Sequence, residues 1–291
     1  MTIAGVELIG EEISNVGRFM VIGGLAVIIM SMAKAGFGGS IGLLAMPLMI
    51  YAVGGGNEKT SLAMGVFLPI LIATDYMNVV VWWRKWRWGV VGRLLPGAVM
   101  GIVIAWAALS FMGFGGAVVT QQAKADRAMA EALMKLGVGV ISLGFVTIRS
   151  IQAIRSRQIA FRPVMWQSTI AGGIAGVTST MAHSAGPVTS MYLLPQNLGK
   201  NAYVATTVLY YFIGNQMKLV PYIHLKLINE TSLKLGLALL PAVPVGVVLG
   251  RWLAKKVNEK VFSVVVYSLL ALAGVDLCRG AIMSLSASGA Q

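Results

Sequence analysis

Long apolar runs separated by short polar gaps dominate the chain from Phe19 to its C-terminal region. Breaks at glycine, proline or charged residues divide this part into segments, many of them near the roughly 20 residues that a helix needs to cross a bilayer. The segments, about ten in number, cover residues 18–34, 38–54, 61–83, 91–112, 132–150, 163–182, 186–199, 202–223, 233–253 and 260–281. The pattern predicts an all-α polytopic membrane protein.

The second and seventh segments are shorter than the others and rich in glycine and proline. We expect them to be broken or half-crossing helices that are buried in protein rather than exposed to lipid. Composition agrees with a membrane protein, because 57% of the 291 residues are hydrophobic and only 11% are charged, against about 25% charged residues in soluble domains. A secreted enzyme, a DNA-binding protein and a disordered chain are thereby excluded.

The net charge of +13 is concentrated in three short gaps between apolar segments. The first gap holds Arg84, Lys85, Arg87 and Arg93, the second Arg149, Arg155, Arg157 and Arg162, and the third Arg251, Lys255, Lys256 and Lys260. An even number of segments separates these gaps, so all three lie on one side, which the positive-inside rule makes cytoplasmic. We therefore expect a multi-pass protein of the cell membrane with both termini outside, and no nucleic-acid partner.

Two pairs of similar stretches reveal an internal repeat. Residues 36–49 resemble residues 183–196 at an offset of 147, and residues 94–106 match residues 239–252 at an offset of 145. Each half then holds five segments, and an odd number places the halves in opposite orientations. Such inverted repeats are typical of secondary transporters with a site near the midplane, although a duplication without a transport role gives the same pattern.

The repeat also predicts the domain organisation. We expect an N-terminal extension (1–17), a first transmembrane repeat (18–150), a basic cytoplasmic linker (151–162), a second transmembrane repeat (163–283) and a C-terminal tail (284–291). The basic gap 84–93 corresponds by repeat to the weakly charged stretch 224–234. We expect the first of these inside the cell and the second outside.

The runs AKAGFGGSIGLLAMP and AGVTSTMAHSAGPVTSMYLLP, with the LLPG and LLPA stretches, resemble the sulfite exporter TauE/SafE family, also called TSUP. The resemblance spans nearly the whole chain. It implies a membrane carrier for sulfite or a sulfonated organic acid, usually acting outward. Ser40 stands where the family continues its glycine run, Ala185 stands where a glycine is common, and His183 is not part of the family pattern.

The two glycine-rich breaks are the first candidates for anion binding. Gly36, Gly38 and Gly39 allow close backbone approach, and a helix starting at Ser40 would point its positive end at a bound anion. Gly186 and Pro187 would do the same from the other half. Alternatively, these glycines only permit tight helix packing.

Charged residues inside apolar segments are the second set of candidates, because intramembrane charges are usually functional. Lys34 is either an anion counter-charge or snorkels to the interface. Lys218, beside Asn215 and Gln216, is a second candidate counter-charge. Asp75 falls next to Lys218 in the repeat, so we expect the two to form a structural pair, with proton coupling through Asp75 as the alternative.

His183 is a candidate proton carrier because histidine titrates near neutral pH, and it is equally a plain hydrogen-bond donor. Ser184 and neighbouring hydroxyls are further candidates for an anion path, or else bond to their own backbone. The expected substrate-binding set is Lys34, Gly36, Gly38, Gly39, Ser40, His183, Ser184, Gly186, Pro187, Asn215, Gln216 and Lys218.

The sequence favours a proton-coupled exporter of a small sulfur-containing anion that works by alternating access. Its expected partners are the small anionic substrate, the lipid bilayer and protons, without a cofactor or a metal; the oligomeric state is open. Alternatives are a cation carrier or channel that uses Asp75, or an intramembrane enzyme that uses His183, Ser184 and Asp75. The single cysteine, Cys278, and the absence of a metal motif such as HExxH disfavour metal chemistry.

Overall fold

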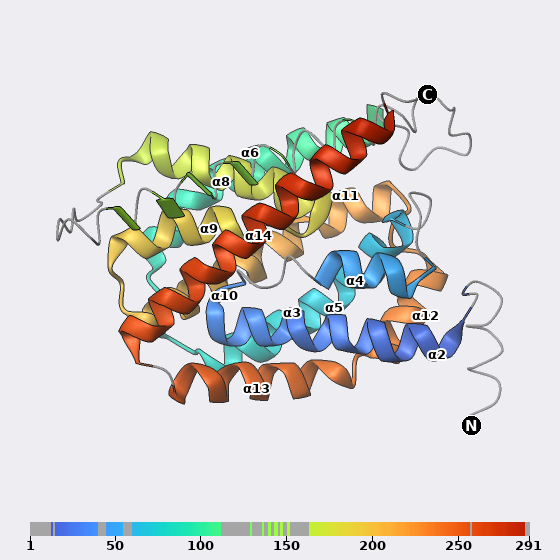
Figure 1. Cartoon of the computed structure of the whole chain (residues 1–291), viewed down its shortest axis with the longest axis horizontal. Coiled ribbons are helices and arrows are strands. Elements are labelled where there is room, and N and C mark those ends of the chain that lie inside the picture. The colour runs from blue at the N-terminus through green and yellow to red at the C-terminus, as the bar shows by residue number, and fades with distance from the viewer. Residues whose placement is uncertain are drawn as a thin grey trace.

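The computed structural model describes residues 13, 15–39, 45–54, 60–111, 163–256 and 258–288, with scattered positions between 129 and 151. Most of these residues are helical, as Figure 1 shows. The helices are α2 (Val16–Arg18), η1 (Phe19–Gly23), α3 (Gly24–Phe37), α4 (Ala45–Ala52), α5 (Thr60–Val81), α6 (Trp88–Phe111), α8 (Met165–Ala182), α9 (Gly186–Leu193), η4 (Leu194–Gln196), α10 (Lys200–Met217), α11 (Leu219–His224), α12 (Glu230–Leu239), α13 (Ala242–Lys256) and α14 (Glu259–Ser288).

Helices in the described part of the chain overlap nine of the ten predicted segments, and most of segment 132–150 lies outside the described residues. Three of them, Val16–Phe37, Ser61–Val81 and Trp88–Phe111, are long and apolar enough to cross a membrane. A fourth candidate is α12 with α13, which meet at a bend of 50°. The protein is therefore an α-helical membrane protein, while the count of ten segments and the domain boundaries stay predictions.

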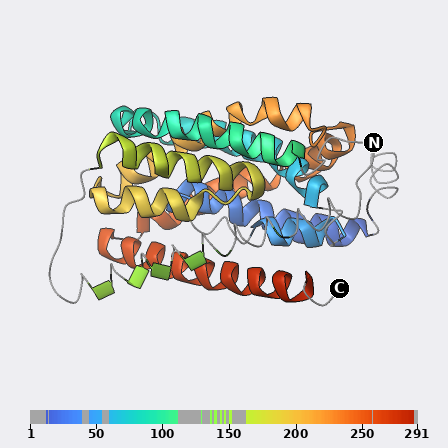
Figure 2. The same ribbon diagram turned by 90° about the horizontal axis from the view of Figure 1, so that it is seen from above.

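Two tight helix pairs join the halves of the chain. Helix α6 runs beside α8, as Figure 2 shows, and α3 runs beside α13, as Figure 1 shows. Glycines permit this approach, because a Cβ atom on Gly101 would lie 2.1 Å from the carbonyl oxygen of Gly173, and one on Gly246 would lie 2.6 Å from that of Ile28. Residues 101 and 246, like residues 28 and 173, are 145 positions apart. Equivalent positions of the predicted repeat therefore meet in the two pairs, and the repeat itself stays a prediction.

Both halves contain a break at the same place in the repeat. Helix α3 ends at Gly38 and α8 ends at His183, and both residues have the left-handed backbone conformation, with φ of 63° and 51°. The next helices, α4 and α9, have 8 residues each, which at 1.5 Å per residue is far too short to cross about 30 Å of hydrocarbon. The long helix α14 lies outside α9 as a separate layer (Figure 2).

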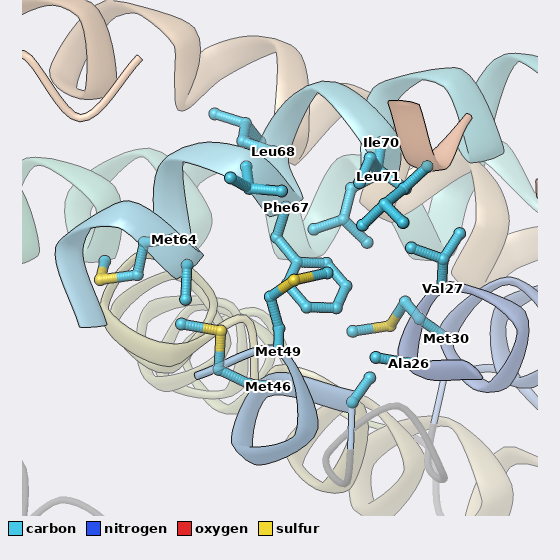
Figure 3. Close-up of a cluster of buried hydrophobic side chains, with 14 of the residues drawn as sticks. Ala26, Val27, Met30, Met46, Met49, Met64, Phe67, Leu68, Ile70 and Leu71 are labelled. Atoms are coloured by element: carbon cyan, nitrogen blue, oxygen red, sulfur yellow. The ribbon is translucent and has the colours of Figure 1, made fainter. Parts of the chain in front are cut away.

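A methionine-rich apolar cluster fills the space between α3, α4 and α5, as Figure 3 shows. Its labelled members are Ala26, Val27 and Met30 from α3, Met46 and Met49 from α4, and Met64, Phe67, Leu68, Ile70 and Leu71 from α5. Flexible methionine side chains fill irregular gaps. The cluster fixes α5 against α3, and Ser31 of α3 also bonds to Thr74 of α5 at 3.1 Å. The polar residues that follow Thr74 in α5, Asp75 and Asn78, are thereby held in place against α3.

Candidate functional site

A small polar cavity lies where the two breaks meet α3, α5 and α10. Its volume is about 30 Å³, enough for about two water molecules. The lining residues are Met30, Lys34, Gly39, Leu71, Ser179, His183, Ala185, Gly186, Tyr211, Asn215 and Lys218. Met30 and Leu71 belong to the apolar cluster of Figure 3, so that cluster forms one wall of the cavity.

Lys34 and Asp75 form a buried ion pair at the edge of the cavity. Lys34 lies in the last turn of α3 and its exposed fraction is 4%, while Asp75 of α5 is fully buried. The side-chain amide of Asn215 donates to the other carboxylate oxygen of Asp75. The ammonium of Lys34 lies 5.2 Å from the ring centre of Tyr211. Lys34 therefore does not snorkel to the interface.

The expected pairing of Asp75 with Lys218 is wrong, because the partner of Asp75 is Lys34. The repeat offset placed Asp75 opposite the end of α10 but gave no information about α3. In the structure Asp75 meets α10 one turn earlier, at Asn215. The last turn of α3 then brings Lys34 to the remaining carboxylate oxygen, and Lys218 is left with other partners.

Lys218 is buried at the junction of α10 and α11, where its exposed fraction is 1%. Its Nζ atom donates to the carbonyl oxygen of Ser179 at 3.2 Å and to the Ser179 hydroxyl at 3.0 Å, and it lies 3.3 Å from Nδ1 of His183. Three acceptors match the three N–H donors of an ammonium. Within the described ranges, no carboxylate lies within ion-pair distance of Lys218.

The contacts of His183 assign its tautomer. When Lys218 is protonated, its ammonium has no lone pair and must donate to Nδ1, which lies 3.3 Å away, so Nε2 carries the proton and donates to the carbonyl oxygen of Met64 at 3.3 Å. The Tyr222 hydroxyl lies 3.4 Å from the same nitrogen. Ser184 donates to the Ala182 carbonyl at 2.8 Å rather than to the imidazole. His183 is therefore neutral and linked to Lys218, and the Ser184 hydroxyl is not bonded to the imidazole in the described structure.

Tyr211 connects the two breaks of the chain. Its hydroxyl donates to the carbonyl oxygen of Gly38 at 3.0 Å and shares a short hydrogen bond with the Thr189 hydroxyl in α9. Its ring also packs against Gly39, where a Cβ atom would lie 2.9 Å from the ring. A neighbouring pair, Tyr203 and Ser190, repeats the link between α10 and α9 at 2.8 Å.

About half of the residues expected to bind substrate meet at this cavity. Those that line it are Lys34, Gly39, His183, Gly186, Asn215 and Lys218. Those that do not line it are Gly36, Gly38, Ser184, Pro187 and Gln216, while Ser40 lies outside the described residues. Gly36 packs against α13 instead, where a Cβ atom would lie 2.3 Å from the carbonyl oxygen of Gly250. Gly36 therefore permits close helix packing, and the binding roles of all these residues stay predictions.

Sequence reasoning missed Tyr211 and the apolar lining residues Met30 and Leu71. A signal for Tyr211 was present, because polar side chains recur at four-residue intervals in the segment 202–223. Tyr203, Thr207, Tyr211 and Asn215 lie at these positions, and all four are buried. This spacing puts them on one helix face, and that face is the one that α10 turns toward the breaks.

The fold and the site together define a helical membrane protein with a buried, cationic cavity at two helix breaks. The sequence profile of the sulfite exporter TauE/SafE family matches residues 22–277. The chain belongs to this family, and it is therefore a membrane transporter of sulfite or related anions. No curated protein and no solved structure gives a significant match.

Proposed function

We propose that the protein is a secondary carrier that exports a small sulfur-containing oxyanion, with the cavity at the two breaks as its substrate site. The observation that carries this proposal is the burial of Lys218 without an ion-pair partner among the described residues. Lys218 is a buried ammonium whose described partners, Ser179 and His183, are all neutral. An uncompensated buried charge is unfavourable, so an anion in the cavity supplies the missing counter-charge.

Two further features support an anion. Lys34 also lines the cavity, so two ammonium groups face one small space. Helix α9 begins at Gly186, which is a lining residue, and the positive end of its dipole lies at the cavity. The volume of about 30 Å³ suits a compact ion such as sulfite better than a long organic chain.

The proposed mechanism is alternating access between two repeats of opposite orientation. The site lies between the halves, with Lys34 and Asp75 from the first half and His183 and Lys218 from the second. The breaks at Gly38 and His183 give each half a hinge at the site. Movement of one half against the other would then open the cavity to one side of the membrane at a time.

The structure disfavours the two alternatives. A cation carrier needs free carboxylate ligands, but Asp75 is already bound by Lys34 and Asn215. An intramembrane enzyme needs a nucleophile beside its base, but the hydroxyl of Ser184 is turned to the Ala182 carbonyl.

The test is uptake of labelled sulfite into proteoliposomes, together with anion-dependent thermal stabilisation of the purified protein. We expect saturable flux and a melting temperature that rises with sulfite concentration. Lys218→Met should weaken sulfite binding at least about tenfold, which is the loss of one charge-assisted hydrogen bond. Lys234→Met is the matched control, because Lys234 is exposed and pairs with Glu230 on the surface. Absence of saturable flux with folded protein would refute the proposal, and so would equal effects of the two variants.

A further inference from the structure

The buried charges at the cavity can be counted. Lys34 and Asp75 neutralise each other. His183 is neutral because its Nδ1 accepts from Lys218. Lys218 adds one positive charge without a described acidic partner. With Lys218 protonated, the empty site therefore carries a net charge of +1 from its described residues.

The other helices that pack on α5 do not change this count within the described parts of the chain. Helix α4 contributes no charged side chain. The hydroxyl and ring of Tyr211 from α10 are neutral neighbours of Lys34. The charged side chains of α12 and α13 are Glu230, Lys234, Arg251, Lys255 and Lys256, all outside the buried core.

Lys34 is placed so that it can change partners. Its side chain lines the cavity, whereas Asp75 lies behind it and does not. Its ammonium contacts the Asp75 carboxylate on one side and the face of Tyr211 on the other. A proton on Asp75 would remove the charge that holds Lys34 there. Lys34 would then be available to an ion in the cavity.

We propose that this arrangement sets the charge of the transported ion. A singly charged sulfur oxyanion binds with Asp75 ionised, and a doubly charged one binds only together with a proton on the Asp75 carboxylate. In both cases the loaded site is neutral, because +1 is matched by one negative charge and +2 by two. Neutrality matters since a net charge is costly in a low-dielectric membrane interior. This inference rests on the proposed function and makes Asp75 the residue that couples protons to dianions.

Methanesulfonate and sulfate are suitable probes, because both are compact sulfur oxyanions and differ by one charge. Their binding to the purified wild-type protein is measured by calorimetry at several pH values, with proton uptake followed by an indicator dye. We expect the affinity for sulfate relative to methanesulfonate to rise by about tenfold for each unit fall in pH where one proton is taken up. Sulfate should take up one more proton than methanesulfonate does at the same pH. Deprotonation of Lys218 would weaken both ions alike, so the ratio of affinities is the readout.

Two variants isolate Asp75. Asp75→Asn fixes the site at +2 when Lys218 is protonated, so the affinity for sulfate relative to methanesulfonate should rise above that of the wild type and should no longer depend on pH. This variant leaves Lys34 without a counter-charge and risks misfolding. The double variant Lys34→Gln, Asp75→Asn removes both charges and returns the site to +1. It should again prefer methanesulfonate, and this preference should not depend on pH.

The outcomes separate the two proposals. Equal, pH-independent binding of both ions by the wild type would overturn the charge rule and leave the proposed function standing. Sulfate binding that strengthens at low pH without proton uptake would also overturn the charge rule. Absence of saturable binding of either ion to folded protein would instead refute the proposed function itself.

Discussion

Gly38 and His183, which are 145 positions apart, both end a long helix in the left-handed backbone conformation beside the same cavity. A side chain is disfavoured in this conformation by about 1–2 kcal/mol, and Gly38 also faces Tyr203, where a Cβ atom would lie 2.6 Å from the ring. The two breaks are therefore equivalent in backbone geometry, but they differ in the side chains that they can accommodate. The break at Gly38 admits only glycine, whereas the break at His183 already accommodates a side chain.

Gly38→Ala should therefore lower the melting temperature of the purified protein, because it adds backbone strain of about 1–2 kcal/mol to the clash with Tyr203. Gly24→Ala is the matched control, since a Cβ atom at Gly24 has nothing within 4 Å and alanine favours a helix. Gly24→Ala should melt at the wild-type temperature or slightly above it. Equal melting of both variants would mean that the break at Gly38 relaxes without strain.

The hydroxyl of Tyr211 should matter for transport more than for folding. Tyr211→Phe removes the links to Gly38 and Thr189, at about 1 kcal/mol for each hydrogen bond, while the ring against Gly39 and Lys34 stays. We expect sulfite flux in proteoliposomes to fall about tenfold, with little change in sulfite affinity. Tyr210→Phe is the control, because the Tyr210 hydroxyl makes one long bond of 3.4 Å to Gly172. Similar loss in both variants would refute a specific role for Tyr211.

Two buried asparagines should respond to the same substitution in opposite directions. Among the described residues, neither side-chain polar atom of Asn78 has a hydrogen-bond partner, and both are buried. Asn78→Leu replaces this unsatisfied amide by an apolar side chain of similar volume and should raise the melting temperature. Asn215→Leu removes the donor to Asp75 and should lower it, by an amount equivalent to about 1–3 kcal/mol. A lower melting temperature for Asn78→Leu would mean that this amide binds a partner in the membrane.

Much of the site could be predicted from the sequence because it is built on breaks and intramembrane charges, and both are visible in a residue pattern. Lys34, His183 and Lys218 were found in this way, and they share one cavity. The pairing of the charges could not be predicted. The pairing depends on how far α3 reaches across α5. The repeat offset relates only equivalent positions in the two halves, and for this reason the offset favoured Lys218 over Lys34 as the partner of Asp75.

The described helices agree with the apolar segments, but helix length alone separates spans from half-crossings poorly. Three helices are long and apolar enough to cross a membrane on their own, and a fourth candidate is the bent pair of α12 and α13.

Gly36 illustrates a second limit of sequence reasoning. A glycine in a motif fits an anion site and a tight helix contact equally well, and only the structure reveals that Gly36 makes such a contact with Gly250.

The orientation of the repeats is open to a labelling test with single cysteines. The basic gap 84–93 and its repeat equivalent 224–234 should lie on opposite sides of the membrane. Lys85 and Lys234 are both exposed, so Lys85→Cys and Lys234→Cys, each in a Cys278→Ser background, report on the two sides. In intact cells a membrane-impermeant maleimide should label Lys234→Cys and spare Lys85→Cys, and lysis should make both reactive. Equal labelling in intact cells would place both gaps outside and contradict the inverted repeat.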